Sequence, residues 1–322
     1  MPTLFHKTLL IILLSSIALF PCSGQKVKTL KPDGYEKANV LRVENGNLKV
    51  VFVDNTELKP RHKPGYSGIA GLYHVEEDTP VFVPDYAGFN LEHVFGGDSL
   101  QQLFEPRRHP MTLFRKADND VLLYQEATPL SGVESLTEFK IVMPHYIDIT
   151  FQCLFHNEHF FRHGYAGLFW ASYIQHPEDK KIYFKGVAPH DPQGSSWIAA
   201  YSEEHGVKST HRQVQDNHDF FFAGNFNARL ANHYSEFRFI EPFYFGRFGK
   251  MVLAYFFDVP EVIRFSQSPT GGGDLNPAWD FQYLIPSPEA GKKYSFRVRM
   301  VYKPFISEED ISAEYEKWKE KK

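Results

Sequence analysis

The sequence has very little cysteine: Cys22 and Cys153 are the only two among 322 residues. Cys22 lies in a segment that we expect to be removed, so Cys153 would be left without a partner for an internal disulfide. We therefore expect the stability of the protein to come from its hydrophobic core. Because Cys153 shares the apolar face of an alternating segment with Ile149 and Phe151, we interpret it as a buried side chain and not as a nucleophile.

An excess of positive charge is also missing. The 35 Lys and Arg residues are outnumbered by 39 Asp and Glu residues, which gives a net charge of -4. Such a balance provides no electrostatic footprint for nucleic acid. The sequence also lacks a phosphate-binding loop with lysine, a dinucleotide fingerprint and a serine elbow. These absences exclude P-loop enzymes, dinucleotide-binding enzymes and hydrolases with a serine elbow, and we expect no cofactor.

Only the N-terminus has a long apolar run, and that run is short for a membrane span. Residues 9–20 are apolar, follow His6 and Lys7, and are followed by the small residues Ser23 and Gly24. This order is typical of a secretory signal peptide over residues 1–24. We therefore expect a periplasmic or secreted protein without stable membrane insertion after cleavage. Whether Cys22 carries a lipid is left open.

What the chain does have is strand periodicity and aromatic residues, with 30 Phe and 17 Tyr. Apolar and polar residues alternate through 293–303, and turn-forming pairs such as Asn45-Gly46 and Pro64-Gly65 separate similar runs. A helix is expected only near the end, where Ser307 precedes an apolar repeat of helical spacing. The pattern predicts an all-β fold, a large antiparallel β-sandwich with a short C-terminal helix, formed by residues 25–322 as a single domain.

The segment SPTGGGDLNPAWDFQYLI, residues 268–285, is unusual because three glycines occur in succession. Glycine permits close backbone approach to a ligand at an entropic cost, so three together favour a ligand-binding loop over a flexible hairpin. An aromatic ring and paired polar groups follow, a mixture that suits the apolar faces and hydroxyls of a sugar. The residues concerned are Gly271, Gly272, Gly273, Trp279, Asp280 and Gln282.

The segment LFEPRRHPM is a second candidate for binding. It places Glu105, Arg107, Arg108 and His109 between two prolines. Adjacent guanidinium groups can bind a carboxylate or sulfate through bidentate hydrogen bonds, as an acidic sugar would require. A solvated loop with an internal Arg–Glu pair is the alternative. The histidines of HNEHFFRHG fit no standard zinc spacing, so we predict no metal site.

Two further segments combine aromatic rings with acid–base groups. GYAGLFWASYIQH contains Trp170, Tyr173 and His176, although Trp170 could equally belong to the core. NLEH contributes Glu92 and His93. A histidine and a carboxylate can hold different protonation states near neutral pH, as general acid–base catalysis requires.

Together with GYSGIAGL and FVPDYAGFNLEHVFGG, these motifs resemble a group of secreted bacterial proteins that look like distant members of the galactose mutarotase-like superfamily. The resemblance implies a β-supersandwich with a sugar-binding cleft. Aldose epimerases of this superfamily use a histidine acid and a late glutamate base. The nearest matches here are FWASYIQH, with His176 displaced, and AWDFQY, with Asp280 in place of the glutamate.

We therefore expect an exported protein that binds a glycan, with an acidic one among the candidates, and acts on it as a hydrolase, lyase or epimerase. A non-catalytic glycan-binding module and a structural envelope protein are the alternatives. The expected catalytic residues are His176, His93, Asp280 and Glu92. The expected substrate-binding residues are Glu105, Arg107, Arg108, His109, Trp170, Tyr173, Gly272, Gly273, Trp279 and Gln282.

Overall fold

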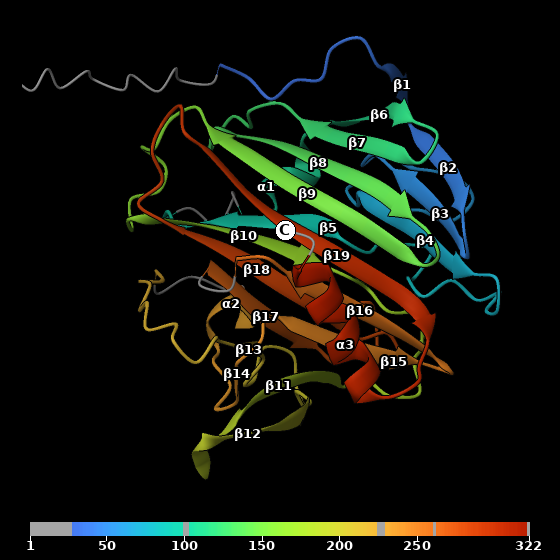
Figure 1. Ribbon diagram of the computed structural model, residues 1–322. Coiled ribbons are helices and arrows are strands. Elements are labelled where there is room, and N and C mark those ends of the chain that lie inside the picture. The colour runs from blue at the N-terminus through green and yellow to red at the C-terminus, as the bar shows by residue number, and fades with distance from the viewer. Residues whose placement is uncertain (1–27, 99–102, 224–228, 260–261, 321–322) are drawn as a thin grey trace, which may run out of the picture.

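The computed structural model describes residues 28–98, 103–223, 229–259 and 262–320, with only the backbone of 192–193. The predicted signal peptide, residues 1–24, lies outside the described residues. Three antiparallel sheets dominate the structure: an 11-stranded sheet, a 5-stranded sheet and a 3-stranded sheet (Figure 1). No helix in the described part of the chain is both long and apolar enough to cross a membrane.

The large sheet has the order β1-β6-β7-β8-β9-β19-β16-β15-β11-β12, and β14 pairs with β11 outside this path. Its strands are β1 (Glu36–Ala38), β6 (Met111–Ala117), β7 (Asp120–Gln125), β8 (Val133–Val142), β9 (Tyr146–Phe155), β11 (Ile182–Ala188), β12 (Asp191–Ala200), β14 (Arg238–Phe239), β15 (Phe243–Phe248), β16 (Met251–Phe257) and β19 (Lys293–Pro304).

The two smaller sheets form the opposite layer. The 5-stranded sheet has the order β13-β17-β18-β10-β5, and the 3-stranded sheet has the order β2-β3-β4. Their strands are β13 (Thr210–His211), β17 (Ile263–Ser268), β18 (Ala278–Pro286), β10 (Tyr165–Ala171), β5 (Asn90–Phe95), β2 (Val40–Asn45), β3 (Leu48–Val53) and β4 (Gly68–His74). The helices are α1 (Glu105–Arg108), α2 (Arg229–Asn232) and α3 (Glu308–Lys319).

The main hydrophobic core lies between these layers and takes side chains from all three sheets. Alternation along the strands explains how it forms: in β19, Phe296, Val298 and Met300 enter the core while the residues between them face away. In β9, Cys153 lies fully buried in the same core, and burial raises the pKa of its thiol. The predicted antiparallel sandwich and the buried cysteine are therefore confirmed.

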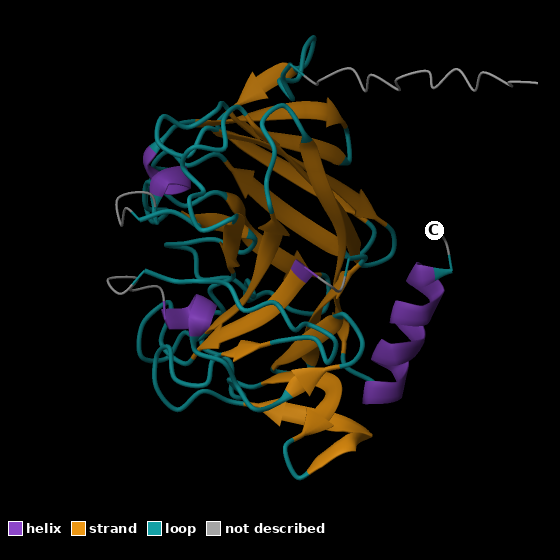
Figure 2. Cartoon of the chain, turned by 90° about the vertical axis from the view of Figure 1, so that its left-hand side faces the viewer, coloured by secondary structure: helices purple, strands orange, loops and turns teal. Residues whose placement is uncertain are grey.

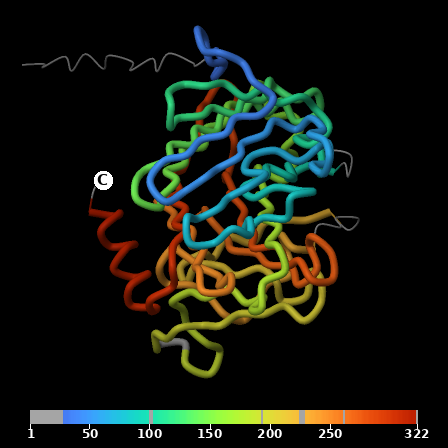
Figure 3. The backbone as a smooth tube through the Cα atoms, turned by 90° about the vertical axis from the view of Figure 1, so that its right-hand side faces the viewer, coloured from blue at the N-terminus to red at the C-terminus, as the bar shows by residue number. Residues whose placement is uncertain are grey.

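Helix α3 covers the outer face of the large sheet, on the side of the molecule opposite α1 and α2 (Figures 2 and 3). The hydroxyl of Ser307 accepts the N–H of Asp310 at 3.2 Å, which caps the helix as the sequence predicted. Ile311, Tyr315 and Trp318 pack against β15 and β16. This leaves the outer face of the 5-stranded sheet, under the loops that carry α1 and α2, as the part of the fold that bears the candidate site.

Candidate acid–base cavity

A cavity of about 200 Å³ lies on the outer face of the 5-stranded sheet. Successive side chains of a strand point to opposite faces, so Ala171 and Asp280 line the cavity while Trp170 and Trp279 enter the core. Tyr173, two residues beyond the end of β10, also lines the cavity. The residues that line the cavity come from β5, β10, β18 and the loops above them: Glu92, His93, Leu103, Phe104, Ala171, Tyr173, His205, Leu230, Gly271, Ala278 and Asp280.

A β-bulge in β5 brings two neighbouring polar residues to this cavity. The register pairs His93 with Phe169 and Leu91 with Trp170, so Glu92 has no residue opposite it in β10. A bulge inserts one residue and re-aims the side chains around it. Leu91 therefore faces the core, whereas Glu92 and His93 both line the cavity.

Glu92 is held by two partners. Its Oε1 accepts Nη1 of Arg107 at 2.8 Å, and its Oε2 accepts the hydroxyl of Tyr173 at 2.7 Å. The Arg107 guanidinium in turn donates through Nε to the carbonyl of Gly65 at 3.1 Å and lies 4.0 Å from the centre of the Tyr66 ring. The ion pair uses the carboxylate form of Glu92, so this site keeps a negative charge at a fixed position.

Asp280 differs from Glu92 because its surroundings favour the protonated form of the carboxyl group. It is 1% exposed, and its Oδ1 accepts the backbone N–H of Ser172 at 3.0 Å. Its Oδ2 has no hydrogen-bond partner among the described residues. Burial raises the pKa of Asp280 well above its ordinary value, and the nearby charge of Glu92 raises that pKa further. Burial therefore favours the carboxylic acid form of Asp280, a side chain that lines the cavity.

His93 supplies a neutral imidazole. Its Nδ1 donates to the carbonyl of Leu103 at 2.9 Å, since a carbonyl can only accept. Burial lowers the pKa of His93, which favours the neutral ring with Nε2 as the acceptor. The cavity thus combines a carboxylic acid, a carboxylate and a neutral imidazole, the set of states that proton transfer requires.

His205 is a second histidine at the cavity, and the sequence interpretation missed it. Its Nδ1 lies 2.8 Å from the Ser268 hydroxyl, and partial burial lowers its pKa. It belongs to the polar segment SEEHG, which looks like an ordinary turn. No local pattern signals that this turn folds over Glu92 and Asp280.

The glycine-rich loop forms part of the cavity wall. Gly271 lines the cavity, and a β-carbon there would lie 2.5 Å from the Cβ of Ala278. Gly273 has a φ of 112°, a conformation that strongly favours glycine. The loop is closed by Asn276, whose backbone carbonyl accepts the N–H of Gly272 at 2.8 Å. It is therefore a fixed turn against the site and not a loose connector.

Leu103 and Phe104 of the LFEPRRHPM segment line the cavity, and Arg107 is the one of its four predicted binding residues that contacts a lining side chain, Glu92. Arg108 is exposed, and the carbonyl of His109 accepts from Asn55 and Gln125. Glu105 does not bind ligand as predicted: it is 1% exposed and accepts the backbone N–H groups of Leu130 and Ser131. The segment therefore forms α1 and supports the cavity through Arg107.

Three residues that the sequence predicts to contact the ligand are fully buried, so that prediction is wrong for them. Trp170 and Trp279 are fully buried in the main core, and Trp170 stacks on Phe281, so neither ring offers a face to a sugar. Gln282 is also fully buried, and its amide donates to the carbonyl of Ala231 at 3.1 Å. Strands covered on both faces place both sets of alternating residues out of contact with solvent.

His176 does not join Asp280. It lies with Gly272 at a separate, larger cavity of about 660 Å³, where Asn276 Oδ1 accepts its backbone N–H at 2.9 Å. The structure therefore assigns the two predicted histidines to two different cavities. Of the four predicted catalytic residues, it brings together His93, Asp280 and Glu92.

No group of three or more His, Cys, Asp or Glu side chains suited to a metal ion occurs within the described ranges. No protein-family model matches the sequence, and no curated protein matches it either.

Solved structures of low sequence identity share parts of the fold. A candidate aldose 1-epimerase from Escherichia coli K12 is 9% identical with a TM-score of 0.49, and the match covers 83% of this chain and 99% of that one. A heparan sulfate lyase mutant from Pedobacter heparinus is 9% identical with a TM-score of 0.42, covering 87% and 37%. A 4-alpha-glucanotransferase from Thermococcus litoralis is 12% identical with a TM-score of 0.40, covering 83% and 39%. The function of this chain is therefore argued from the side chains that line its cavities.

Proposed function

We propose that this protein binds a sugar in the cavity between β5, β10 and β18 and acts on it by general acid–base catalysis. One observation supports this function above all: Asp280 as a buried acid and Glu92 as an ion-paired carboxylate line the same cavity as neutral His93. A cavity of about 200 Å³ suits a ligand on the scale of one sugar ring.

Each residue has a distinct role in this proposal. The O–H of Asp280 donates a proton to a sugar oxygen as a carbon–oxygen bond breaks, and Nε2 of His93 accepts a proton from a hydroxyl of the sugar or from water. Both oxygens of Glu92 already accept hydrogen bonds, so Glu92 acts through its charge, which favours a protonated His93. Return of both protons restores the site. Hydrolysis and anomer interconversion need these two transfers, whereas in elimination the base takes its proton from a carbon of the sugar.

The test is a turnover screen with a matched pair of variants. The wild type, Asp280→Asn and Asp274→Asn are compared on neutral and acidic sugars by three readouts: anomer interconversion, new reducing ends and unsaturated products. Asp274 is exposed on the same loop and lines neither cavity. We expect turnover by the wild type and Asp274→Asn, and a loss of about a hundredfold or more in Asp280→Asn. Equal turnover by all three proteins would contradict the assignment.

A non-catalytic glycan-binding module is the second candidate. It is favoured by the engagement of both Glu92 oxygens, since hydrogen bonds from Arg107 and Tyr173 make that carboxylate a weaker base and nucleophile. This alternative predicts sugar binding that survives Asp280→Asn and no turnover in any assay.

We also infer that the chain is exported. The charged, apolar and small residues of segment 1–24 support this inference. Fractionation of cells that produce the full chain tests it: we expect the protein in the periplasm or medium with a mature N-terminus near Gln25. Intact Met1 in a cytoplasmic fraction would overturn it.

A further inference from the structure

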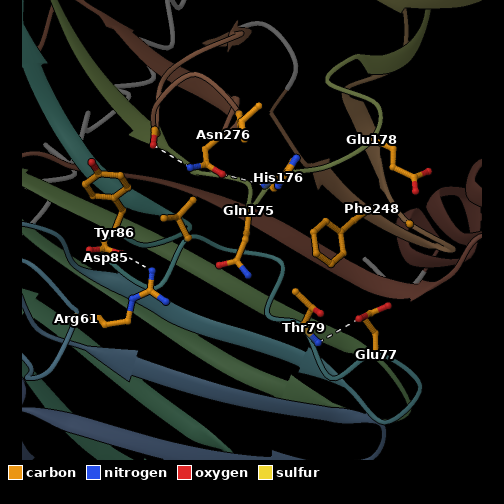
Figure 4. A pocket seen from close by; sticks show the side chains of 14 residues that line it. Arg61, Glu77, Thr79, Asp85, Tyr86, Gln175, His176, Glu178, Phe248 and Asn276 are labelled. Atoms are coloured by element: carbon orange, nitrogen blue, oxygen red, sulfur yellow. Dashed lines mark hydrogen bonds and ion pairs between the residues drawn. The ribbon is translucent and has the colours of Figure 1, made fainter.

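The larger cavity lies beside the acid–base cavity and has no role in the chemistry proposed above. It measures about 660 Å³, and Figure 4 shows Gln175 between Arg61 and Asp85 on one side and Phe248 and Glu178 on the other. It therefore has room for a ligand considerably larger than the one that the acid–base cavity can hold.

The two cavities share one wall. Gly271 lines the smaller cavity and Gly272, the next residue, lines the larger one. The aromatic part of the wall is divided in the same way: Tyr173 lines the smaller cavity, Tyr86 lines the larger one, and their ring centres are 4.9 Å apart. Residues adjacent in the chain and two rings in contact thus separate the two spaces, which lie close enough together for neighbouring units of one oligosaccharide to occupy both.

The wall of the larger cavity is held in place by hydrogen bonds between two loops. Asn276 accepts the backbone N–H of His176 and donates its side-chain amide to the carbonyl of Gly272 at 3.1 Å. His176 has a φ of 45°, a backbone conformation that is uncommon for residues other than glycine. These contacts fix the two loops before any ligand arrives, which reduces the ordering cost of binding.

The charge of the larger cavity limits which kinds of sugar it can bind. Its lining has three carboxylates, on Glu77, Asp85 and Glu178, and one guanidinium, on Arg61. That guanidinium is already paired with Asp85 at 2.8 Å. The smaller cavity adds the Glu92 carboxylate, which Arg107 balances. An acidic sugar would meet net negative charge here, which disfavours uronates and sulfated units.

We propose that the larger cavity is a second sugar-binding site, which binds the adjoining unit of an oligosaccharide whose end lies in the acid–base cavity, and that this unit carries no acidic group. Gln175, Tyr86 and Phe248 line this cavity, and their amide and ring atoms supply the polar and apolar contacts that a sugar needs. This inference rests on the proposed function for the placement of the reacting unit.

The test uses three linear β-1,4 tetrasaccharides that share one backbone: glucose units, glucosamine units, and glucose units oxidised at C6 to carboxylates. Calorimetry at low salt measures their binding to the wild type, Gln175→Ala, Glu178→Gln and the exposed control Glu126→Gln. We expect the oxidised chain to bind at least about tenfold more weakly than the other two, and Glu178→Gln to narrow that difference. Gln175→Ala should weaken all binding, and Glu126→Gln should change nothing.

Stronger binding of the oxidised chain, unchanged binding in both cavity variants, or no binding of any tetramer would overturn the inference. The failure of this inference can be distinguished from the failure of the proposed function. Binding that depends on Gln175 without turnover contradicts acid–base catalysis only, whereas turnover that is indifferent to Gln175→Ala and Glu178→Gln contradicts the second site only.

Discussion

The hydroxyl of Tyr173 donates to Oε2 of Glu92 at 2.7 Å and thereby joins strand β5 to the chain that follows β10. Burial and the charge of Glu92 raise the pKa of Tyr173 well above its ordinary value, so this hydroxyl keeps its proton. Tyr173 thus holds one oxygen of the Glu92 carboxylate while Arg107 holds the other, so substitutions at either partner test the importance of this position.

Tyr173→Phe removes this hydrogen bond and keeps the ring. A hydrogen bond to a charged group contributes on the order of 2 kcal/mol, so we expect a decrease of that size in the free energy of unfolding, measured by urea denaturation. Sugar turnover should also fall, by about tenfold. Tyr86→Phe is the control, because its hydroxyl contacts Lys63 and not Glu92. Equal losses in the two variants would show that the Glu92 contact has no special importance.

Arg107→Met leaves the Glu92 carboxylate buried without its cation. Breaking a buried ion pair from one side costs about 3 to 5 kcal/mol, and here the cost should fall toward the lower end because the Arg107 side chain is 21% exposed. The double variant Arg107→Met with Glu92→Gln should recover part of that stability, since no unpaired charge remains. Thermal unfolding of the four proteins measures the coupling. Strictly additive effects would contradict the ion pair.

Gly246→Ala tests the assignment of Trp279 to the core. A β-carbon at position 246 would lie 2.3 Å from the Trp279 ring. Overpacking of this kind costs about 1 to 3 kcal/mol, and we expect a lower melting temperature with little change in sugar affinity. Adding Trp279→Phe should relieve part of the strain. A large loss of affinity without loss of stability would instead place Trp279 at the ligand.

Asp280→Asn should change how stability depends on pH. In the unfolded chain an aspartate ionises near pH 4, whereas burial keeps Asp280 protonated in the folded protein. The folded state then binds more protons than the unfolded state above about pH 4, so stability falls as pH rises toward the raised pKa. The variant lacks this loss, and its stability relative to the wild type should increase from about pH 4 to 7. The opposite trend would mean that folded Asp280 is ionised.

The strands could be predicted from sequence because their alternation is local. In β19 and β9 the residues that face the core repeat every second position, and in the capped helix α3 the buried residues Ile311, Tyr315 and Trp318 recur at helical spacing. The bulge at Glu92 could not be predicted, because an unpaired residue is defined by the register of the partner strand. For this reason the sequence could name Glu92 and His93 but could not show that they share a face.

Burial on both sides of a strand explains the errors at the tryptophans. β10 and β18 are covered by the core on one side and by loops on the other, so aromatic residues on either side look alike in sequence. The resemblance to aldose epimerases pairs His176 with Asp280 through the segments FWASYIQH and AWDFQY. The glycine-rich loop separates them in space, and only the folded chain shows that partition.

The proposed chemistry depends above all on Asp280 being a carboxylic acid beside the Glu92 carboxylate in one cavity. Carbon-13 NMR of protein labelled at the aspartate carboxyl carbons tests this most directly, with the Asp280 signal identified by its absence from Asp280→Asn. We predict that this signal remains that of a protonated carboxyl from about pH 4 through pH 7. A signal that titrates near pH 4, as an ordinary aspartate does, would contradict the account.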